Sequence, residues 1–226
     1  MKYLLGVLLV GLSASAIAQT KDETVARPDL PGDLMVDIGL NFWDETPGGL
    51  DLQSWPSKSV GIYYTRRKAY GGKFALHYGV GLGLEKIGLG DDSTFFSGEA
   101  LTIGELPIEQ VDKNKLAITY LDIPIEFRFH PTGTQDGEGF FIGVGAIGGL
   151  RLNSHTKWRY TENGETKRQK ISGEFNLNAW RYGVQIRLGF KGVHFFYKQF
   201  LSDTFKSSLN EVNPRLTTIG INITGF

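Results

Sequence analysis

The chain has 226 residues with 24 basic and 24 acidic side chains, so its formal net charge is zero and gives no overall attraction to nucleic acid or other polyanions. It contains no cysteine, which excludes a disulfide framework and a lipid-accepting cysteine. Its 30 glycines and 12% aromatic residues, with no long helical periodicity, favour an all-β protein of many strands.

The N-terminus has the pattern of an export signal. The segment MKYLLGVLLVGLSASAIAQ carries one lysine, an apolar run, and small residues that end in the A-x-A pattern at 16–18. We predict a signal peptide over 1–18, whose removal takes Lys2 away and leaves a formal charge of −1. The apolar run is too short to span a bilayer, and no second apolar segment of about twenty residues follows it. Residues 19–32, which include two prolines, are predicted to be a flexible tail.

Residues 33–226 are predicted to form one domain, because no Pro/Ser-rich linker or block of charge divides them. Eight segments in this domain alternate apolar and polar residues with the period of two that is typical of β-strands. The predicted strands cover 33–43, 58–70, 73–89, 115–131, 140–160, 170–190, 193–203 and 216–226, with a loop over 44–57 and a long polar loop over about 90–113. Near Ala179 and Trp180 the alternation changes phase, which predicts a β-bulge.

Strand length and connection length predict what kind of β-protein this is. Strands of about ten to twenty residues exceed the usual five or six of soluble sheets. Short connections follow the second, fourth and sixth strands, and the others are mostly long. An even number of such strands, with an apolar residue at every second position, is typical of an outer-membrane barrel. Closure pairs the first strand with the last and satisfies every backbone group in hydrocarbon. We therefore predict an all-β, eight-stranded antiparallel transmembrane barrel of the outer-membrane type.

Four segments carry a resemblance to a known family: YLDIPIEFRF with its mid-strand proline, YGVGLGLEKIGL, FFIGVGAIGGL and the C-terminal GINITGF. With these segments the chain resembles the PorT-like outer-membrane β-barrel family of Bacteroidetes-type, Gram-negative bacteria. The resemblance implies an eight-stranded barrel in the outer membrane with both termini, and so the tail over 19–32, in the periplasm. For function it implies an accessory or anchoring component of an envelope assembly, such as protein secretion across the outer membrane.

Polar side chains on the face opposite the apolar residues are predicted to fill the lumen. An eight-stranded barrel is only wide enough for its interior to be filled by side chains. Opposite charges there are expected to pair, because a buried unpaired charge is costly. The predicted polar network of the lumen consists of Asp37, Glu85, Asp122, Glu126, Arg128, Arg151, Arg181, Arg187 and Lys198. The alternative is that these charges form a path for protons or small ions.

No motif in the chain predicts catalysis. GVGAIG at 143–148 matches the G-x-G-x-x-G dinucleotide fingerprint, but these glycines lie inside a predicted strand and not in the required strand-turn-helix context. They are expected instead to make room for bulky lumen side chains. Ser154 and His155 are neighbours on a strand and point to opposite faces, so they cannot form a nucleophile-base pair. No His/Cys cluster has metal-ligand spacing. We predict a non-enzymatic protein without catalytic residues, cofactor or metal site.

Three hypotheses for function remain. The first is the accessory or anchoring role implied by the resemblance. The second is a stand-alone surface-exposed binding or adhesion barrel that acts through its long outer loops, because apolar residues in an exposed loop favour contact with a partner. Its predicted contact residues are Phe95, Phe96, Leu101, Ile103 and Leu106. The third is a narrow channel, which a filled lumen disfavours. The expected partners are outer-membrane lipid and other envelope or secretion proteins, and no nucleic acid.

Overall fold

The computed structural model describes residues 32–47, 50, 52–90, 93–96, 102–105, 111–132, 139–162, 164–190, 192–208 and 212–224. They belong to one compact unit that extends from Gly32 to Phe226. The predicted signal peptide, 1–18, and residues 19–31 of the predicted tail lie outside the described residues. In the described part of the chain there is no helix long and apolar enough to cross a membrane.

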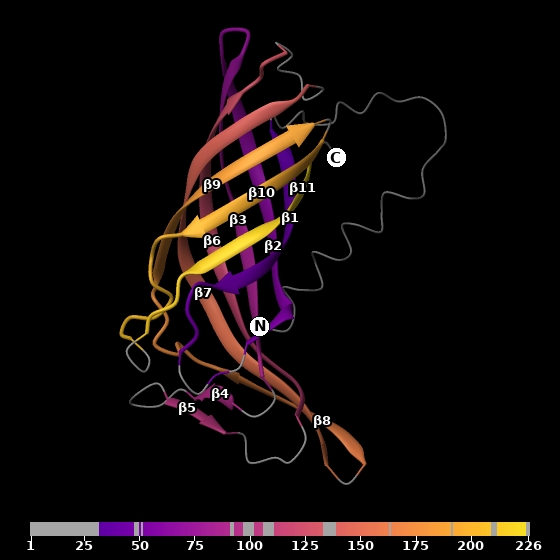
Figure 1. Cartoon of the computed structure of the whole chain (residues 1–226), viewed down its shortest axis with the longest axis vertical. Helices are drawn as coiled ribbons and strands as arrows, with labels where there is room; N and C mark the ends of the chain where they lie inside the picture. The colour runs from indigo at the N-terminus through magenta and orange to yellow at the C-terminus, as the bar shows by residue number, and fades with distance from the viewer. Residues whose placement is uncertain are drawn as a thin grey trace, which may run out of the picture. The chain divides into compact units, whose positions relative to one another are not determined.

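Antiparallel β-strands make up the described fold (Figure 1). The strands are β1 (Asp33–Trp43), β2 (Leu52–Tyr70), β3 (Phe74–Leu89), β4 (Ser93–Phe96), β5 (Thr102–Glu105), β6 (Val111–Phe129), β7 (Phe141–Glu162), β8 (Glu165–Ser172), β9 (Trp180–Phe190), β10 (Val193–Phe200) and β11 (Leu216–Thr224). Eight of them follow one another in the order β6-β3-β2-β1-β11-β10-β9-β7, and a further pairing of β6 with β7 closes the sheet into a barrel. β1 pairs with β11, so the first and last strands meet. The predicted eight-stranded antiparallel barrel is confirmed.

The two ends of the barrel differ in their connections. Residues 71–73 join β2 to β3 and residues 191–192 join β9 to β10 at the end where β1 begins and β11 ends. We call this the short-turn end. The opposite end carries the connections over 44–51, 90–110 and 201–215, together with the hairpin of β7 and β8. We call it the long-loop end.

Several strands continue past the barrel at the long-loop end. β2 and β6 have 19 residues each and β7 has 22. Among the described residues β8 pairs with β7 alone, and β4 and β5 form a separate two-stranded sheet. Figure 1 shows β4, β5 and β8 at the same end of the molecule. Two predicted loops are therefore wrong in extent, because β2 begins at Leu52 inside the predicted loop 44–57 and β4 and β5 form inside the predicted loop 90–113.

The strand predicted over 170–190 is interrupted. β8 ends at Ser172 and β9 begins only at Trp180, so the chain leaves the sheet in between and the predicted β-bulge is wrong. Phe175 and Asn176 have φ angles of 48° and 50°, in the left-handed region that non-glycine residues seldom adopt. Phe175 is 1% exposed. The burial of an aromatic side chain provides the compensation that such a backbone conformation needs.

Apolar side chains cover the outside of the barrel. On β6 the odd-numbered residues from Leu121 to Phe129 are 36% to 54% exposed, whereas the even-numbered residues from Asp122 to Arg128 are buried. On β9 the even-numbered residues from Tyr182 to Phe190 are exposed in the same way. A continuous apolar outside with a polar inside suits a hydrocarbon environment and not water.

Apolar side chains also close the mouth of the barrel at the long-loop end. Phe95, Phe175, Leu177 and Phe205 are each 1% exposed or less. The rings of Phe95 and Phe205 lie 5.5 Å apart, and Trp43 packs edge-on against both. The cluster, which we call the apolar plug, consists of Ile87, Leu89, Phe95, Leu116, Ile118, Tyr120, Ile147, Phe175, Leu177, Phe200, Phe205 and Leu216. Strand and loop residues together thus form a hydrophobic layer across the lumen.

Candidate functional site

Among the described residues, the lumen contains equal numbers of buried carboxylate and Lys/Arg side chains in mutual contact. The acids come from β1, β3 and β6, and the bases come from β6, β9 and β10. They are Asp37, Glu85, Asp122, Glu126, Arg128, Arg181, Arg187 and Lys198, and each is 7% exposed or less. The structure thus brings together eight of the nine residues predicted for the lumen network. Four negative and four positive charges leave the interior neutral, as burial in a narrow barrel requires.

The first group of contacts, nearer the long-loop end, is centred on Arg181. Arg181 donates to Asp122 through Nε at 3.0 Å and through Nη2 at 2.6 Å, and to Glu85 through Nη1 at 3.0 Å. Asn41 donates to the other Glu85 oxygen at 2.8 Å. The guanidinium carbon of Arg181 lies 3.8 Å from the ring centroid of Tyr120 and 4.3 Å from that of Phe200. Two ion pairs and two ring contacts hold this side chain in place. We call Arg181, Glu85 and Asp122 the Arg181 cluster.

The second group of contacts lies nearer the short-turn end. We call it the Arg187 cluster, and it consists of Arg187, Asp37, Glu126, Arg128 and Lys198. Arg187 donates to Asp37 at 3.1 Å and 3.4 Å and to Glu126 at 3.0 Å, so it links β9 to β1 and β6 across the lumen. Lys198 Nζ lies 2.6 Å from the second Asp37 oxygen. Arg128 Nε lies 2.5 Å from Glu126. Every carboxylate of this cluster has at least two basic neighbours, which offsets the cost of its burial.

Uncharged side chains complete the network. Tyr63 joins the two clusters, because its hydroxyl donates to Asp122 at 3.4 Å and accepts from Lys198 at 3.4 Å. Asn222 donates to Asp37 at 2.5 Å, and Gln185 donates to Glu126 at 3.0 Å. The predicted network omitted these residues because it was restricted to charged side chains. The alternation in the sequence already predicts that Gln185 faces inward, and the same signal could have placed Tyr63 and Asn222 there.

Glycines on β3 and β7 provide the space that the network occupies. A Cβ added to Gly83 or Gly149 would overlap the Asp122 carboxylate and crowd Arg181, and one added to Gly143 would lie 2.7 Å from a Glu126 oxygen. Gly148, which lies on the other face of the same strand, has open space around it. Bulky ion pairs therefore fit in the lumen because the facing strand positions lack side chains.

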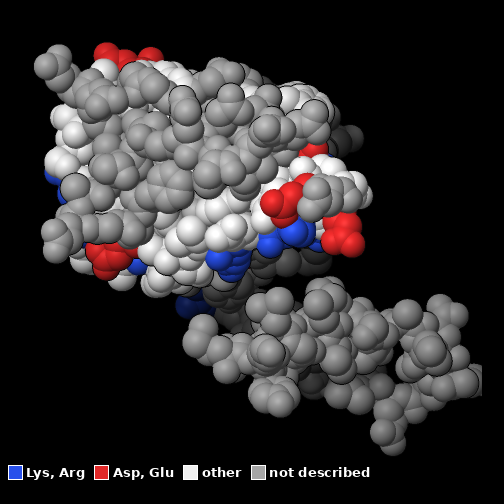
Figure 2. Space-filling model, turned by 90° about the horizontal axis from the view of Figure 1, so that it is seen from below, with Lys and Arg blue, Asp and Glu red and all other residues white. Residues whose placement is uncertain are grey.

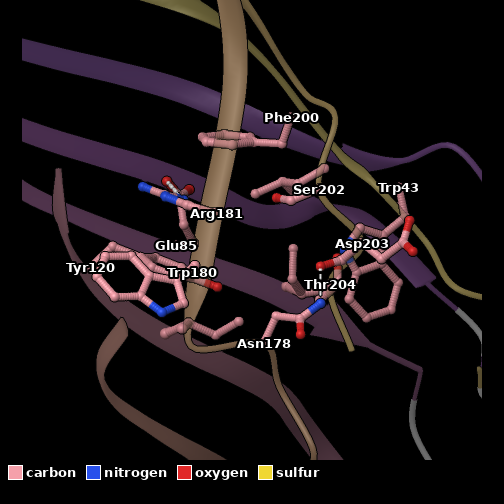
Figure 3. Close-up of a pocket in the computed structure, with 13 residues that line it drawn as sticks. Trp43, Glu85, Tyr120, Asn178, Trp180, Arg181, Phe200, Ser202, Asp203 and Thr204 are labelled. Atoms are coloured by element: carbon pink, nitrogen blue, oxygen red, sulfur yellow. Dashed lines mark hydrogen bonds and ion pairs between the residues drawn. The ribbon is translucent and has the colours of Figure 1, made fainter. Parts of the chain in front are cut away.

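The cavities described beside the two clusters are small. The cavity between the Arg181 cluster and the apolar plug, which Figure 3 shows with its lining residues, has a volume of about 20 Å³. A second cavity beside the Arg187 cluster, lined by residues that include Met35, His77 and Pro124, has about 10 Å³. A water molecule needs about 10–15 Å³ on this scale, so each cavity holds about one water molecule. Between the described strands, ion pairs and the apolar plug fill the lumen.

Arg151 does not belong to the lumen network, and its prediction is wrong. Its guanidinium donates to Ser154 Oγ at 3.1 Å and to the Asn178 carbonyl at 3.4 Å, and it lies 4.0 Å from Glu174. Arg151 lies opposite Tyr120, and the register of β6 and β7 shifts only at the next residue of β7, so Arg151 keeps an inward position at the barrel mouth and contacts the segment that follows β8. Arg151 thus holds that segment in the barrel mouth.

The segment after β8 has further polar contacts. Ser154 Oγ donates to the Gly173 carbonyl at 2.5 Å, so this serine is bound to the backbone and not to His155. The hydrogen bond from Lys206 at 3.2 Å, with the charges of Lys206 and Arg151, lowers the pKa of the exposed Glu174 carboxyl. Among the described residues no group of three or more His, Asp or Glu side chains could hold a metal ion.

The predicted contact loop has a different arrangement from the one expected. Phe95 is 0% exposed and belongs to the apolar plug, so its prediction as an exposed contact residue is wrong. Burial against Trp43 and Phe205 stabilises this aromatic ring more than exposure to water would. Phe96 lies in β4 and Ile103 in β5, and the structure describes their backbones only. Leu101 and Leu106 lie outside the described residues.

A comparison with models of protein families identifies the family to which this barrel belongs. The family model for the outer membrane protein beta-barrel domain matches residues 54–210, which is more than half of the chain. The chain belongs to this outer-membrane β-barrel family. The apolar outside of the barrel is therefore its lipid-facing surface, and the protein is located in the outer membrane.

Two solved structures are similar in outline. Ail, the attachment invasion locus protein of Yersinia pestis, matches 87% of this chain and 100% of its own, with 11% identity and a TM-score of 0.37. A second structure of Ail, in complex with the heparin analogue sucrose octasulfate, matches the same shares with 9% identity and a TM-score of 0.33. Similarity at this level carries no conclusion about the present chain. No curated protein matches the chain.

Proposed function

We propose that this protein is a non-enzymatic, sealed outer-membrane anchor that binds other envelope proteins through its long-loop end. The observation that supports the proposal most strongly is the combination of a filled lumen with strands that continue past the membrane. A barrel strand needs about 9–11 residues to cross the hydrocarbon region, whereas β7 has 22. About ten residues of β7 therefore remain for a rigid extension, which is roughly 30 Å along the strand.

The side chains of this extension favour contact with a partner over transport through the barrel. Along β7 the outward side chains are apolar as far as Leu152, which is 53% exposed, and polar or charged beyond it. Seen from this end, the described surface carries both basic and acidic groups (Figure 2). The filled lumen opposes the channel hypothesis, and the burial of Phe95 weakens the version of surface binding that relied on the loop over 90–110. The β7–β8 hairpin is the strongest remaining candidate for partner contact.

Affinity purification from gently solubilised outer membranes tests the proposal. The matched control is a variant in which Asn-Gly replaces residues 160–167, so that Arg159 and Arg168, which are register partners, are joined by a two-residue turn. Other envelope proteins recovered at stoichiometric levels with the wild type, and lost with the shortened hairpin, would support the proposal. Recovery of the barrel alone, or of the same proteins with the shortened hairpin, would contradict it.

The identity of the assembly and the orientation in the membrane are part of the same proposal. The PorT-like resemblance supports an accessory role in protein secretion. The short connections support a periplasmic short-turn end, with 1–18 removed as a signal peptide and the tail over 19–32 in the periplasm. An epitope at Gly164 is then accessible to antibody in intact cells and one inserted after residue 20 is not. The reverse labelling would overturn the orientation.

A further inference from the structure

A band of basic side chains crosses the outer wall of the protein at the long-loop end. In register, Lys58 of β2 lies opposite Lys86 of β3, and Lys115 of β6 lies opposite Lys157 of β7. Lys157 in turn lies opposite Lys170 of β8. A second row, one step further along the strands, places Lys113 opposite Arg159 and Arg159 opposite Arg168. We call these eight side chains the basic band.

The first row of the basic band is continuous from β2 to β8. Lys86 lies opposite Ala117, and Lys115 is two residues from Ala117 on the same strand, so Lys86 and Lys115 are diagonal neighbours on one face. Lys86 is also two residues from Leu84, which is a lipid-facing residue that is 37% exposed. The basic band therefore faces outward and begins one step beyond the apolar belt.

The arrangement is unfavourable for the protein by itself. Like charges directly opposite one another on neighbouring strands are destabilising, and here they recur across β6, β7 and β8 in both rows. Among the described residues the band has one acidic partner in contact, Asp112, which lies 3.2 Å from Arg159. The other seven members make no ion pair with a described acid. A ligand that carries negative charge would remove this repulsion.

The band also has the shape of a binding groove. Seven of its members line an open groove of about 490 Å³, together with Gln53, Trp55, Asp112, Asn114 and Trp158. This volume is in the range of small-molecule sites. Trp55 is 76% exposed, and the Lys58 ammonium lies 5.1 Å from its ring centroid. An exposed tryptophan beside lysines, at the edge of a lipid-facing apolar surface, is typical of the level of lipid headgroups.

We propose that the basic band binds the phosphate-bearing headgroup of an anionic membrane lipid. The acyl chains of such a lipid lie along the apolar belt, which includes Leu84 and Ile62, and its phosphate groups lie among the lysines one step further along. The continuity of the groove with the lipid-facing surface favours a lipid over a soluble phosphate compound, because a lipid contacts both surfaces at once. This inference uses the location in the outer membrane and does not depend on the proposed partner binding.

Reconstitution of the full mature barrel into vesicles tests the inference. The wild type, the double variant Lys115→Gln/Lys157→Gln and the control Lys68→Gln/Lys73→Gln at the short-turn end are each placed in phosphatidylcholine vesicles with or without phosphatidic acid. Native mass spectrometry measures bound lipid, and thermal unfolding measures stability. Each lysine near a membrane surface strengthens the binding of an anionic lipid about fivefold. We therefore expect phosphatidic acid to bind about thirtyfold more weakly to the Lys115→Gln/Lys157→Gln variant than to the wild type or the control.

The unfolding temperature in neutral lipid distinguishes a lipid-binding role of Lys115 and Lys157 from a structural one. Without phosphatidic acid, the Lys115→Gln/Lys157→Gln variant should unfold at the same temperature as the wild type or a higher one, because it lacks the cross-strand repulsion. Phosphatidic acid should then raise the unfolding temperature of the wild type and the control more than that of the variant. Equal lipid binding by all three proteins would overturn the inference. If soluble glycerol phosphate stabilised the wild type as much as phosphatidic acid does, the conclusion that the phosphate belongs to a lipid would be overturned.

Discussion

Replacing Arg187 with leucine removes the side chain that links β9 to both β1 and β6 across the lumen. Arg187 is 1% exposed and makes three hydrogen bonds to carboxylates, two to Asp37 at 3.1 Å and 3.4 Å and one to Glu126 at 3.0 Å. In Arg187→Leu both carboxylates remain buried, and each keeps two other donors. The interior then contains one more negative than positive charge.

The size of the effect follows from the partners that remain. Breaking a buried ion pair typically costs about 3–5 kcal/mol, because the partner is left as an uncompensated charge. Asp37 and Glu126 each keep a basic neighbour, so we expect Arg187→Leu to lower the free energy of unfolding by about 3 kcal/mol and not by twice that amount. Arg187→Lys keeps the charge but loses the planar fork, and should cost about 1–2 kcal/mol.

Urea unfolding of the refolded barrel in detergent micelles, followed by tryptophan fluorescence, measures both variants against the wild type. The reasoning requires the order wild type, Arg187→Lys, Arg187→Leu in unfolding free energy. An Arg187→Leu barrel within about 0.5 kcal/mol of the wild type, the range of neutral surface substitutions, would refute the proposed stabilisation by paired charges. If Arg187→Leu does not refold at all, the intermediate stability of Arg187→Lys still tests the argument.

Two further substitutions, each with a matched control, test the packing of the lumen by the same unfolding assay. Gly149→Ala should lower the unfolding free energy by about 1–3 kcal/mol, because the added Cβ overlaps the Asp122 carboxylate, while Gly148→Ala on the open face should leave it unchanged. Equal values for the two variants would contradict the role of glycine in making room. Phe95→Ala should cost about 3–5 kcal/mol because it opens a cavity in the apolar plug, and Phe195→Ala, at a lipid-facing position that is 66% exposed, should cost clearly less.

The barrel itself could be predicted from the sequence because lipid and lumen impose a period of two on every strand. On β6, for example, the residues from Leu121 to Phe129 could be assigned to faces by parity alone, and strand number and closure followed from the even count and the connections. The same parity placed Asp37 and Arg187 inside, although they are 150 residues apart in the chain.

The parts that could not be predicted depend on contacts between distant residues. The local sequence gives no signal for a left-handed backbone at Phe175 and only a weak one at Asn176, because asparagine tolerates this region better than other non-glycine residues. The burial of Phe95 depends on Phe205, which is brought near only by the closed barrel. Arg151 was assigned to the network by parity, but its partners are Ser154, the Asn178 carbonyl and Glu174, two of which lie in the segment after β8, and the path of that segment cannot be read from the alternation.

Single-channel recording tests the central claim, that the barrel is sealed and acts through its surface. The purified wild-type barrel is inserted into a planar lipid bilayer, and insertion is verified by its resistance to extraction in a parallel vesicle sample. Because ion pairs and the apolar plug occupy the lumen, and the two cavities described beside them have volumes of about 20 Å³ and 10 Å³, the account predicts no conductance above that of the bare bilayer. Stable, reproducible ion-conducting openings of the wild-type barrel would contradict it.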